Sequence, residues 1–318
     1  EYKIDGYRFD LAKGFTQTYS VGNIGLWGQY DASRVYNITR MCAHIDSVNA
    51  GTYKILEMFA DNSEETVYAN QGIMLWGNSN YNYNEATMGW VNTSNFSWAS
   101  YQQRGWNQPS LISYMESHDE ERLMYKNIQY GNSGSAPAYD IKDTITGLAR
   151  VELAAAFFIP IPGPKMIWQF GEMGYDYSIN YCSNGTINTA CRVDPKPIKW
   201  NYYTQFARRK LYNVLASLNM LKTSYPVFST TNYQIQFNGQ FKRMHLNDPS
   251  MNVTILGNFG ITSGNMDPNF QSTGWWYNYF TGDSIYVNNV HDPVTLDHGE
   301  YRLYTNIHIP PFAINLGT

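Results

Sequence analysis

Hydrophobic positions in about the first two hundred residues switch between two spacings. Three short runs are almost continuously apolar, which is typical of strands buried on both faces; they are 53–59, 111–117 and 165–170. Between them apolar residues recur every three or four positions, as in helices, in 35–45, 139–158 and 204–222. Strands that alternate with helices favour parallel βαβ units, so the pattern predicts an α/β fold built as a barrel or a doubly wound sheet. We interpret 77–84, which is rich in Asn and Tyr, as a loop.

The pattern changes at about residue 224. Short alternating stretches separated by Gly, Asn and Pro follow, at 233–237, 253–256 and 300–304. Such stretches indicate an antiparallel all-β module. We therefore expect two domains, an α/β domain over 1–223 and an antiparallel β-sandwich over 224–318.

Amino-acid composition argues against some classes of binding partner and favours others. The chain has 318 residues, 43% of them hydrophobic, which is enough for a sizeable core. Only 15% are charged and the net charge is −4, which argues against nucleic acid and anionic membranes as partners. No apolar run is long enough to span a bilayer. Aromatic residues reach 16%, and exposed aromatic rings suit the stacking face of a sugar, although many of them belong to a core.

The three cysteines indicate the redox state of the cellular compartment in which the protein works. Cys182 and Cys191 lie in one polar loop and are close enough in sequence to form a disulfide, whereas Cys42 lies among apolar residues at helical spacing and is expected to be a buried thiol. One disulfide favours an oxidising environment. We expect a secreted, periplasmic or cell-surface protein.

Another strand pattern precedes these runs, near the start of the sequence. It ends with an arginine and a carboxylate two residues apart. Side chains alternate along a strand, so Arg8 and Asp10 share one face, while Tyr7, Phe9 and Leu11 share the other, which is apolar enough to pack under helices. A guanidinium beside a carboxylate keeps it ionised, as a nucleophile requires. An ordinary structural ion pair gives the same pattern.

Two further acidic residues lie in or just beyond strand patterns. Glu57 stands among Ile, Leu, Met and Phe, and this setting should raise the pKa of its carboxyl group. Asp119 follows the strand at 111–117. In a parallel barrel the carboxyl ends of the strands meet, so Asp10, Glu57 and Asp119 are expected to converge. A neutral acid beside an ionised carboxylate is what retaining cleavage of a glycosidic bond requires, but Glu57 could instead be a strand-end residue that reaches solvent.

Three segments, 5–13 (Asp-Gly-Tyr-Arg-Phe-Asp-Leu-Ala-Lys), 55–59 (Ile-Leu-Glu-Met-Phe) and 117–119 (Ser-His-Asp), occur in the order of conserved regions of a known family. They resemble the second, third and fourth sequence regions of the α-amylase family, glycoside hydrolase family 13. The resemblance implies Asp10 as nucleophile, Glu57 as general acid/base and Asp119 as transition-state stabiliser.

The same resemblance implies substrate contacts. Arg8 would orient the nucleophile, and His118 would hydrogen-bond the sugar in the reactive subsite. Lys13 would line an acceptor subsite and favour α-1,4-glucans. The implied activity is retaining hydrolysis of starch-like α-glucan polysaccharides or maltooligosaccharides.

The resemblance extends over nearly the whole chain. Segment 162–172 resembles the eighth barrel strand of the family, and 296–304 resembles the closing strand of its C-terminal β-sandwich. It implies a partial (β/α)8 barrel, strands four to eight, followed by an all-β sandwich. The Asp-x-x-x-Asn-His element of the first family region is absent. We therefore expect the sequence to be a piece of a longer chain.

Two alternatives stay open. The chain could be a catalytically incomplete barrel fragment that binds α-glucan, associates with itself or assembles with an N-terminal half-barrel, because five strands cannot close an eight-stranded barrel. It could also be a transglycosylase of the same family, which uses the same carboxylates. The sequence assigns no cofactor and no metal site; a cation such as calcium could bind at the loop 175–178, although turn chemistry explains the composition of that loop equally well.

Overall fold

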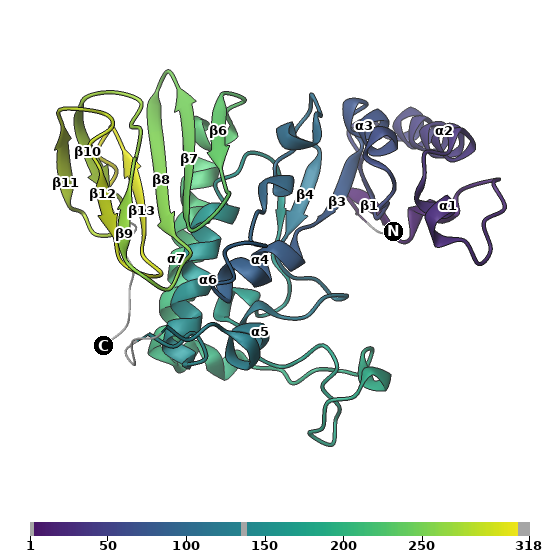
Figure 1. Ribbon diagram of the computed structural model, residues 1–318. Coiled ribbons are helices and arrows are strands. Elements are labelled where there is room, and N and C mark those ends of the chain that lie inside the picture. The colour runs from purple at the N-terminus through teal and green to yellow at the C-terminus, as the bar shows by residue number, and fades with distance from the viewer. Residues whose placement is uncertain (1–2, 135–138, 311–318) are drawn as a thin grey trace. The chain divides into compact units, whose positions relative to one another are not determined.

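A computed structural model describes residues 3–134 and 139–310 of the chain (Figure 1). Contacts divide the chain into two compact units. The first comprises Glu1–Asn78, Trp98–Tyr114 and Gly163–Met166, and the second comprises Ser79–Ser97, Met115–Pro162 and Ile167–Thr318. We describe each unit by itself. The predicted domain boundary between 223 and 224 stays a prediction.

The first unit is built on a five-stranded parallel sheet. Its strands are β1 (Gly6–Phe9), β2 (Tyr53–Leu56), β3 (Met74–Asn78), β4 (Leu111–Tyr114) and β5 (Lys165–Met166), and they lie side by side in that order. Each strand pairs in parallel with the next along the chain. Consecutive parallel neighbours are the arrangement of a barrel segment, so the predicted partial (β/α)8 barrel is confirmed.

Two features of this region differ from the sequence prediction. The strands stop three or four residues earlier than the apolar runs do, because the chain turns away at the carboxyl end of the sheet. The predicted loop at 77–84 is wrong: it contains the end of β3 and helix α4 (Asn80–Thr87). Asn80 donates hydrogen bonds to the main-chain oxygens of Met115 (2.8 Å) and Glu121 (2.9 Å), and these tertiary contacts outweigh the low helix propensity of Asn and Tyr.

Helices α1 (Ile24–Gly28), α2 (Ala32–Val48) and α3 (Asn62–Asn70) belong to the first unit, and Figure 1 shows α2 and α3 next to each other. Asp31 caps α2 by accepting hydrogen bonds from the N–H groups of Ser33 and Arg34. The thiol of Cys42 on α2 is buried, as predicted.

A buried ion pair joins α2 to α3. Arg34 Nη2 lies 2.6 Å from Glu64 Oε2, and Arg34 Nε lies 2.7 Å from Glu64 Oε1. Both side chains are inaccessible to solvent. The same guanidinium donates to the main-chain oxygens of Lys13, Trp27 and Gln29, so it fixes the turn that follows β1.

The second unit combines helices with antiparallel sheets. Besides α4, its helices are α5 (Leu123–Tyr130), α6 (Thr144–Phe158) and α7 (Phe206–Ser224), and α6 and α7 run side by side (Figure 1). The helix predicted from residue 139 begins at Thr144, because the side chain of Asp143 accepts a hydrogen bond from the N–H of Thr146 and caps it. None of the helices in the described ranges has the length and apolar composition to cross a bilayer.

The antiparallel β module is confirmed. A six-stranded sheet has the order β11-β10-β13-β8-β7-β6, and β12 pairs with β9 in a second, two-stranded sheet. The strands are β6 (Tyr233–Gln236), β7 (Phe241–Asp248), β8 (Met251–Asn258), β9 (Gly264–Met266), β10 (Gly274–Asn278), β11 (Ser284–Val287), β12 (Val294–Leu296) and β13 (Tyr301–Thr305). Leu256, Met266, Trp276 and Leu296 form part of its core. Trp276 is fully buried there, whereas its neighbour Trp275 is 53% exposed on the opposite face.

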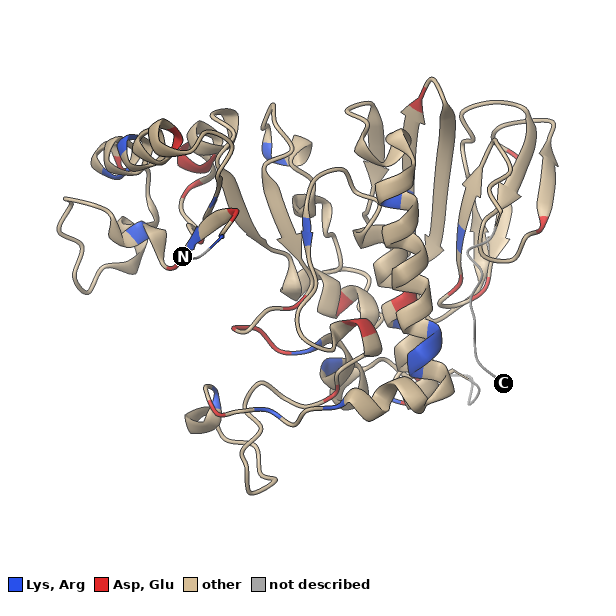
Figure 2. Ribbon diagram, turned by 180° about the vertical axis from the view of Figure 1, so that it is seen from behind, with Lys and Arg blue, Asp and Glu red and all other residues tan. Residues whose placement is uncertain are grey.

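Short 3₁₀ turns complete the chain. They are η1 (Ala12–Gly14), η2 (Ser97–Ala99), η3 (Gln102–Arg104), η4 (Gly171–Met173), η5 (Thr189–Cys191), η6 (Trp200–Thr204) and η7 (Pro226–Ser229). Basic and acidic residues are interspersed along the ribbon, in keeping with the small net charge (Figure 2).

We predict that Glu64→Gln lowers the free energy of unfolding by about 3 kcal/mol, because it leaves the buried Arg34 without its charged partner. Urea denaturation measures this change. Asp46→Asn is the control, since it removes the partly exposed ion pair with Lys54 and should cost less than about 1 kcal/mol. Equal stability of the two variants would contradict the prediction.

Candidate active site

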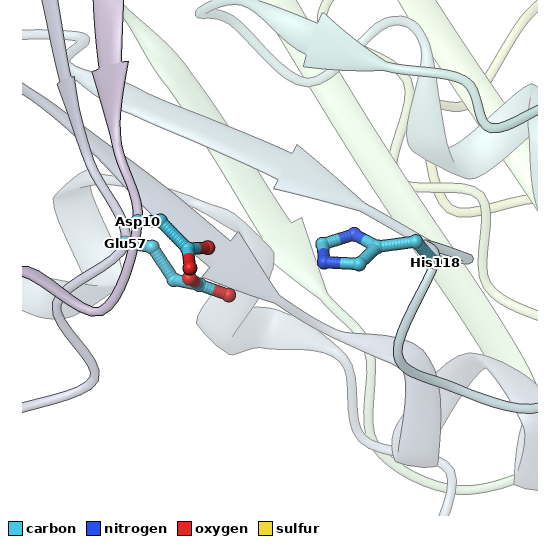
Figure 3. Close-up of side chains that lie close together, drawn as sticks. All are labelled: Asp10, Glu57 and His118. Carbon is cyan, nitrogen blue, oxygen red and sulfur yellow. The ribbon is translucent and has the colours of Figure 1, made fainter. Parts of the chain in front are cut away.

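The predicted nucleophile and general acid lie together at the carboxyl end of the parallel sheet. Asp10 directly follows β1, and Glu57 directly follows β2. Strand register sets this proximity, because Phe9 pairs with Leu56 and the next residue of each strand carries the carboxyl group. The carboxylate oxygens of Asp10 and Glu57 lie within 4.8 Å of each other, and Figure 3 shows the two side chains lying side by side.

The two carboxyl groups have different environments. The side chain of Glu57 is only 8% exposed, whereas that of Asp10 is 75% exposed. Leu56 and Met58, on either side of Glu57, are fully buried. The hydrophobic setting predicted for Glu57 from the sequence is therefore present.

Burial raises the pKa of Glu57. A hydrogen bond with Asp10 and the negative charge of that carboxylate raise it further. The N–H of Leu11, which donates to Glu57 Oε2 at 3.0 Å, and the guanidinium of Arg8 lower it. Burial is the largest of these causes, so the pKa shifts in the direction that the sequence predicts.

Arg8 lies between the two acids. Its Nη1 donates to Asp10 Oδ1 at 3.1 Å. Its Nη2 lies 3.1 Å from Glu57 Oε2, although the two groups are not aligned for a hydrogen bond. The guanidinium also lies over the ring of Trp76 on β3, 4.6 Å from the ring centroid, which fixes its plane. The sequence predicts the contact with Asp10 and misses the contact with Glu57.

The chain beyond β1 turns sharply. Leu11 adopts a left-handed conformation, with φ of 46°, and this turn directs its N–H at Glu57. The expectation of packing under helices is wrong for Tyr7 and Leu11, since their exposed fractions are 45% and 53%, whereas Phe9 is half-buried. β1 is one of the two edge strands of the described sheet, and its residues are more exposed than those of the inner strand β4.

Lys13 lies in the turn after β1 and is half-buried. Its main-chain oxygen accepts hydrogen bonds from Trp27 Nε1 (3.1 Å) and Arg34 Nη1 (3.3 Å). Its ammonium group lies 4.7 Å from the ring centroid of Trp27. Burial, and then the charge of Arg34, lower the pKa of Lys13.

The other two predicted residues belong to the second unit. His118 and Asp119 are adjacent on the loop that follows β4, where His118 Nε2 lies 3.3 Å from Asp119 Oδ2. The His118 ring lies 5.7 Å from that of Trp168. Because the two units are described separately, the convergence of Asp119 with Asp10 and Glu57 stays a prediction.

A contact that the sequence does not predict also lies in the second unit. Arg192 Nη2 lies 3.2 Å from Asp119 Oδ1. Arg192 follows the disulfide between Cys182 and Cys191, which confirms the predicted bridge. The position of Arg192 next to Cys191 indicates from the sequence that Arg192 lies beside the disulfide. Its contact with Asp119, 73 positions away, has no such indication in the sequence.

Asp176, in the loop suggested for a cation, has other partners. Its Oδ2 accepts a hydrogen bond from Arg208 Nη2 at 2.6 Å, and its Oδ1 accepts one from the hydroxyl of Tyr202. A calcium ion there would have to displace Arg208. The loop is better explained as an internal ion pair.

Comparison with known proteins gives structural matches only. No family model matches the chain, and no curated protein matches it in sequence. Among solved structures, AmyP in complex with maltose is 14% identical, with a TM-score of 0.68, covering 98% of this chain and 65% of that one. The α-amylase GTA from Geobacillus thermoleovorans, complexed with acarbose, is 12% identical, with a TM-score of 0.62 and coverages of 87% and 59%.

A pullulanase is similar in structure as well. Pullulanase from Bacillus acidopullulyticus is 18% identical, with a TM-score of 0.61, and the match covers 96% of this chain and 38% of that one. The chain thus spans less than two thirds of the length of these structures. Identities this low establish the fold, and they agree with the resemblance seen in the three motifs. The chain has the fold of the α-amylase family of glycoside hydrolases.

Proposed function

We propose that the protein containing this chain is a retaining glycoside hydrolase that cleaves α-1,4-glucosidic bonds of starch-like α-glucans by double displacement. The observation that carries the proposal is the Asp10–Glu57 pair, whose oxygens lie within 4.8 Å. Carboxyl groups of retaining enzymes are separated by about 5–5.5 Å, whereas inverting enzymes need a wider gap for a water molecule. The opposed environments of the two groups support one acid and one nucleophile.

In the first step the Asp10 carboxylate attacks the anomeric carbon. The bond from that carbon to the leaving glucosyl oxygen breaks, and the oxygen takes the proton of Glu57. In the second step Glu57 removes a proton from water, whose oxygen attacks the same carbon and releases Asp10. Two inversions leave the product in the α-configuration.

The remaining residues have supporting roles in this proposal. Arg8 orients Asp10 through the 3.1 Å hydrogen bond. Asp119 stabilises the positive charge that develops on the sugar ring, and His118 hydrogen-bonds a sugar hydroxyl. Lys13 lines the side that accepts the glucan. Solved structures of similar fold contain maltose, maltotriose or acarbose, which supports oligosaccharides as ligands.

A second candidate is an incomplete barrel. β1 and β5 are the edges of the five-stranded sheet in the described residues, and the chain spans less than two thirds of the similar structures. As an isolated piece it would bind α-glucan, associate with itself or assemble with an N-terminal half-barrel rather than turn over. Size-exclusion chromatography and glucan hydrolysis, measured on the chain alone and on the longer protein, separate the two candidates.

The disulfide between Cys182 and Cys191 supports an oxidising location. We therefore include secretion, the periplasm or the cell surface in the proposal. Cell fractionation followed by immunodetection tests it, and a protein confined to a reducing compartment would contradict it.

We predict that Glu57→Gln slows starch hydrolysis by about 10²–10⁴-fold, because the leaving oxygen no longer receives a proton. An aryl α-maltotrioside with an acidic phenol needs no such proton, so its first step should survive. Azide should then react with the glycosyl intermediate without a general base and give an α-glycosyl azide, which chromatography and NMR identify.

Asp10→Asn should abolish reaction of both substrates, because the attacking carboxylate is lost. Asp5→Asn, at the other end of the same strand, is the matched control and should keep wild-type activity.

The product from maltotriose distinguishes transglycosylation, which yields longer oligosaccharides. Full activity of Glu57→Gln on starch, or a wild-type protein that leaves α-glucans intact, would contradict the proposed function.

We also predict that Arg8→Met raises the pKa of Glu57 further, because it removes a positive charge that lowers this pKa. A general acid must be protonated, so the rate falls as pH rises through its pKa. The basic limb of kcat/KM should therefore move to higher pH in the variant.

NMR titration of ¹³C-labelled glutamate, assigned with Glu57→Gln, measures this pKa without any substrate. Arg40→Met, which removes an exposed arginine of α2, is the control. A pKa of Glu57 that stays constant or falls in Arg8→Met would show that Arg8 does not act on this carboxyl group.

A further inference from the structure

The loop that follows η4 in the second unit forms one side of a cavity of about 360 Å³. His118 and Asp119 line the cavity together with Trp168, and the loop contributes Arg192 and Lys196. The predicted stabilising aspartate therefore faces a wall made by a segment more than fifty residues further along the chain.

Covalent and hydrogen bonds fix this loop internally. The disulfide joins Cys182 to Cys191 across nine positions. Lys196 Nζ donates to the main-chain oxygens of Tyr181 (3.1 Å) and Cys191 (2.6 Å), so it ties both ends of the disulfide-closed turn together. The N–H of Cys182 donates to the oxygen of Thr186 at 2.8 Å inside the turn.

The loop is also anchored to the segment that bears Asp119. Glu121 Oε1 accepts a hydrogen bond from the N–H of Ile179 at 2.8 Å, and Glu121 Oε2 accepts one from the hydroxyl of Ser178 at 2.7 Å. The segment that leads into the disulfide-closed turn is therefore bonded to Glu121, two residues after Asp119.

Arg192 uses this frame to hold Asp119. Its Nη2 donates to Asp119 Oδ1 at 3.2 Å and also to the main-chain oxygen of Asp119. One guanidinium nitrogen therefore restrains both the side chain and the backbone of the same residue. Apart from this contact and His118 Nε2, which lies 3.3 Å from Asp119 Oδ2, packing does little to fix the rotamer of Asp119, since its side chain is 47% exposed.

We propose that Arg192 is a positioning residue for Asp119, and that the Cys182–Cys191 disulfide acts by keeping Arg192 in place. This inference rests on the proposed function, in which Asp119 stabilises the charge on the sugar. Arg192 acts through Asp119 and is not assigned a contact with the reacting atoms. The activity of the protein then depends on an oxidised loop.

Orientation outweighs charge neutralisation in this pair. Both partners are about half exposed, so water and salt screen the charge of Arg192 and the ion pair itself contributes little. Misplacing a group that contacts the transition state by about 1 Å costs up to about 10²-fold in rate. Removing Arg192 should therefore reduce activity, although it frees the charge of Asp119.

The first experiment compares Arg192→Ala and Arg192→Lys with wild type in the protein containing this chain. We expect Arg192→Ala to lower kcat on maltooligosaccharides by about tenfold, with a smaller change in KM, because the affected interaction is made in the transition state. Arg192→Lys should recover part of the loss, since an ammonium group can donate one of the two bonds.

Arg243→Ala is the matched control. Arg243, on β7, also donates to a main-chain oxygen, that of Asp267, and to a side-chain oxygen, that of Gln236. It should leave kcat unchanged. An equal loss in both alanine variants, or no loss in Arg192→Ala, would overturn the proposal.

The second experiment tests the disulfide. Besides Cys182 and Cys191 the chain has one cysteine, the buried thiol of Cys42, so within this chain a reductant acts on one bridge. Reduction, or the double change of Cys182 and Cys191 to Ser, should lower kcat in the same direction as Arg192→Ala does. In Arg192→Ala itself reduction should add no further loss, because the two changes act through one contact. Additive losses would overturn the role of the disulfide.

Hydrogen exchange gives a readout that needs no substrate. Peptides covering 117–122 should exchange faster in Arg192→Ala than in wild type or Arg243→Ala, because the restraint on the Asp119 backbone is lost. Equal exchange would overturn the proposal whatever the activity. A wild-type protein inactive on α-glucans with faster exchange in Arg192→Ala would refute the proposed function and leave the positioning contact supported.

Discussion

The burial of one carboxyl group at the end of β2 is the constraint on which the candidate site depends. Glu57 lies between fully buried hydrophobic neighbours, and ionising it there is costly. The N–H of Leu11 and the guanidinium of Arg8 compensate this cost only in part. Since burial raises the pKa of Glu57 and these two donors lower it, Glu57 holds its proton more tightly than a glutamate in water and can still release it. The second acid, Asp10, needs the opposite setting, and its exposed side chain provides it.

The surrounding structure holds these groups at their separation. The register of β1 and β2 brings the two acids to adjacent positions, and main-chain hydrogen bonds continue beyond the strands, from Glu57 N–H to the oxygen of Phe9 and from Ala12 N–H to the oxygen of Glu57. The buried Arg34–Glu64 pair then secures the turn that carries Lys13. Stability and candidate chemistry are therefore linked, because the helices that support the sheet also position the residues after β1.

The second unit presents its predicted residues differently. His118 and Asp119 lie on an exposed loop, and no strand restrains their side chains. A disulfide-closed segment supplies the restraint through Arg192. Rigid scaffolds commonly carry functional residues on loops, and a loop then needs its own bracing to keep a side chain in one orientation.

The sequence by itself determined the alternation of strands and helices in the first part of the chain, the antiparallel module, the disulfide and the direction of the pKa shift of Glu57, because each of these depends on neighbours a few positions away. Local pattern could not show that helix α4 forms within an Asn- and Tyr-rich segment, since side-chain bonds to Met115 and Glu121 stabilise it. It also failed for Tyr7 and Leu11, whose exposure depends on what lies beside β1 in space. Only the tertiary structure placed Arg8 against Glu57 and Arg192 against Asp119, because contacts between residues so far apart in sequence arise from chain topology, which spacing along the sequence does not encode.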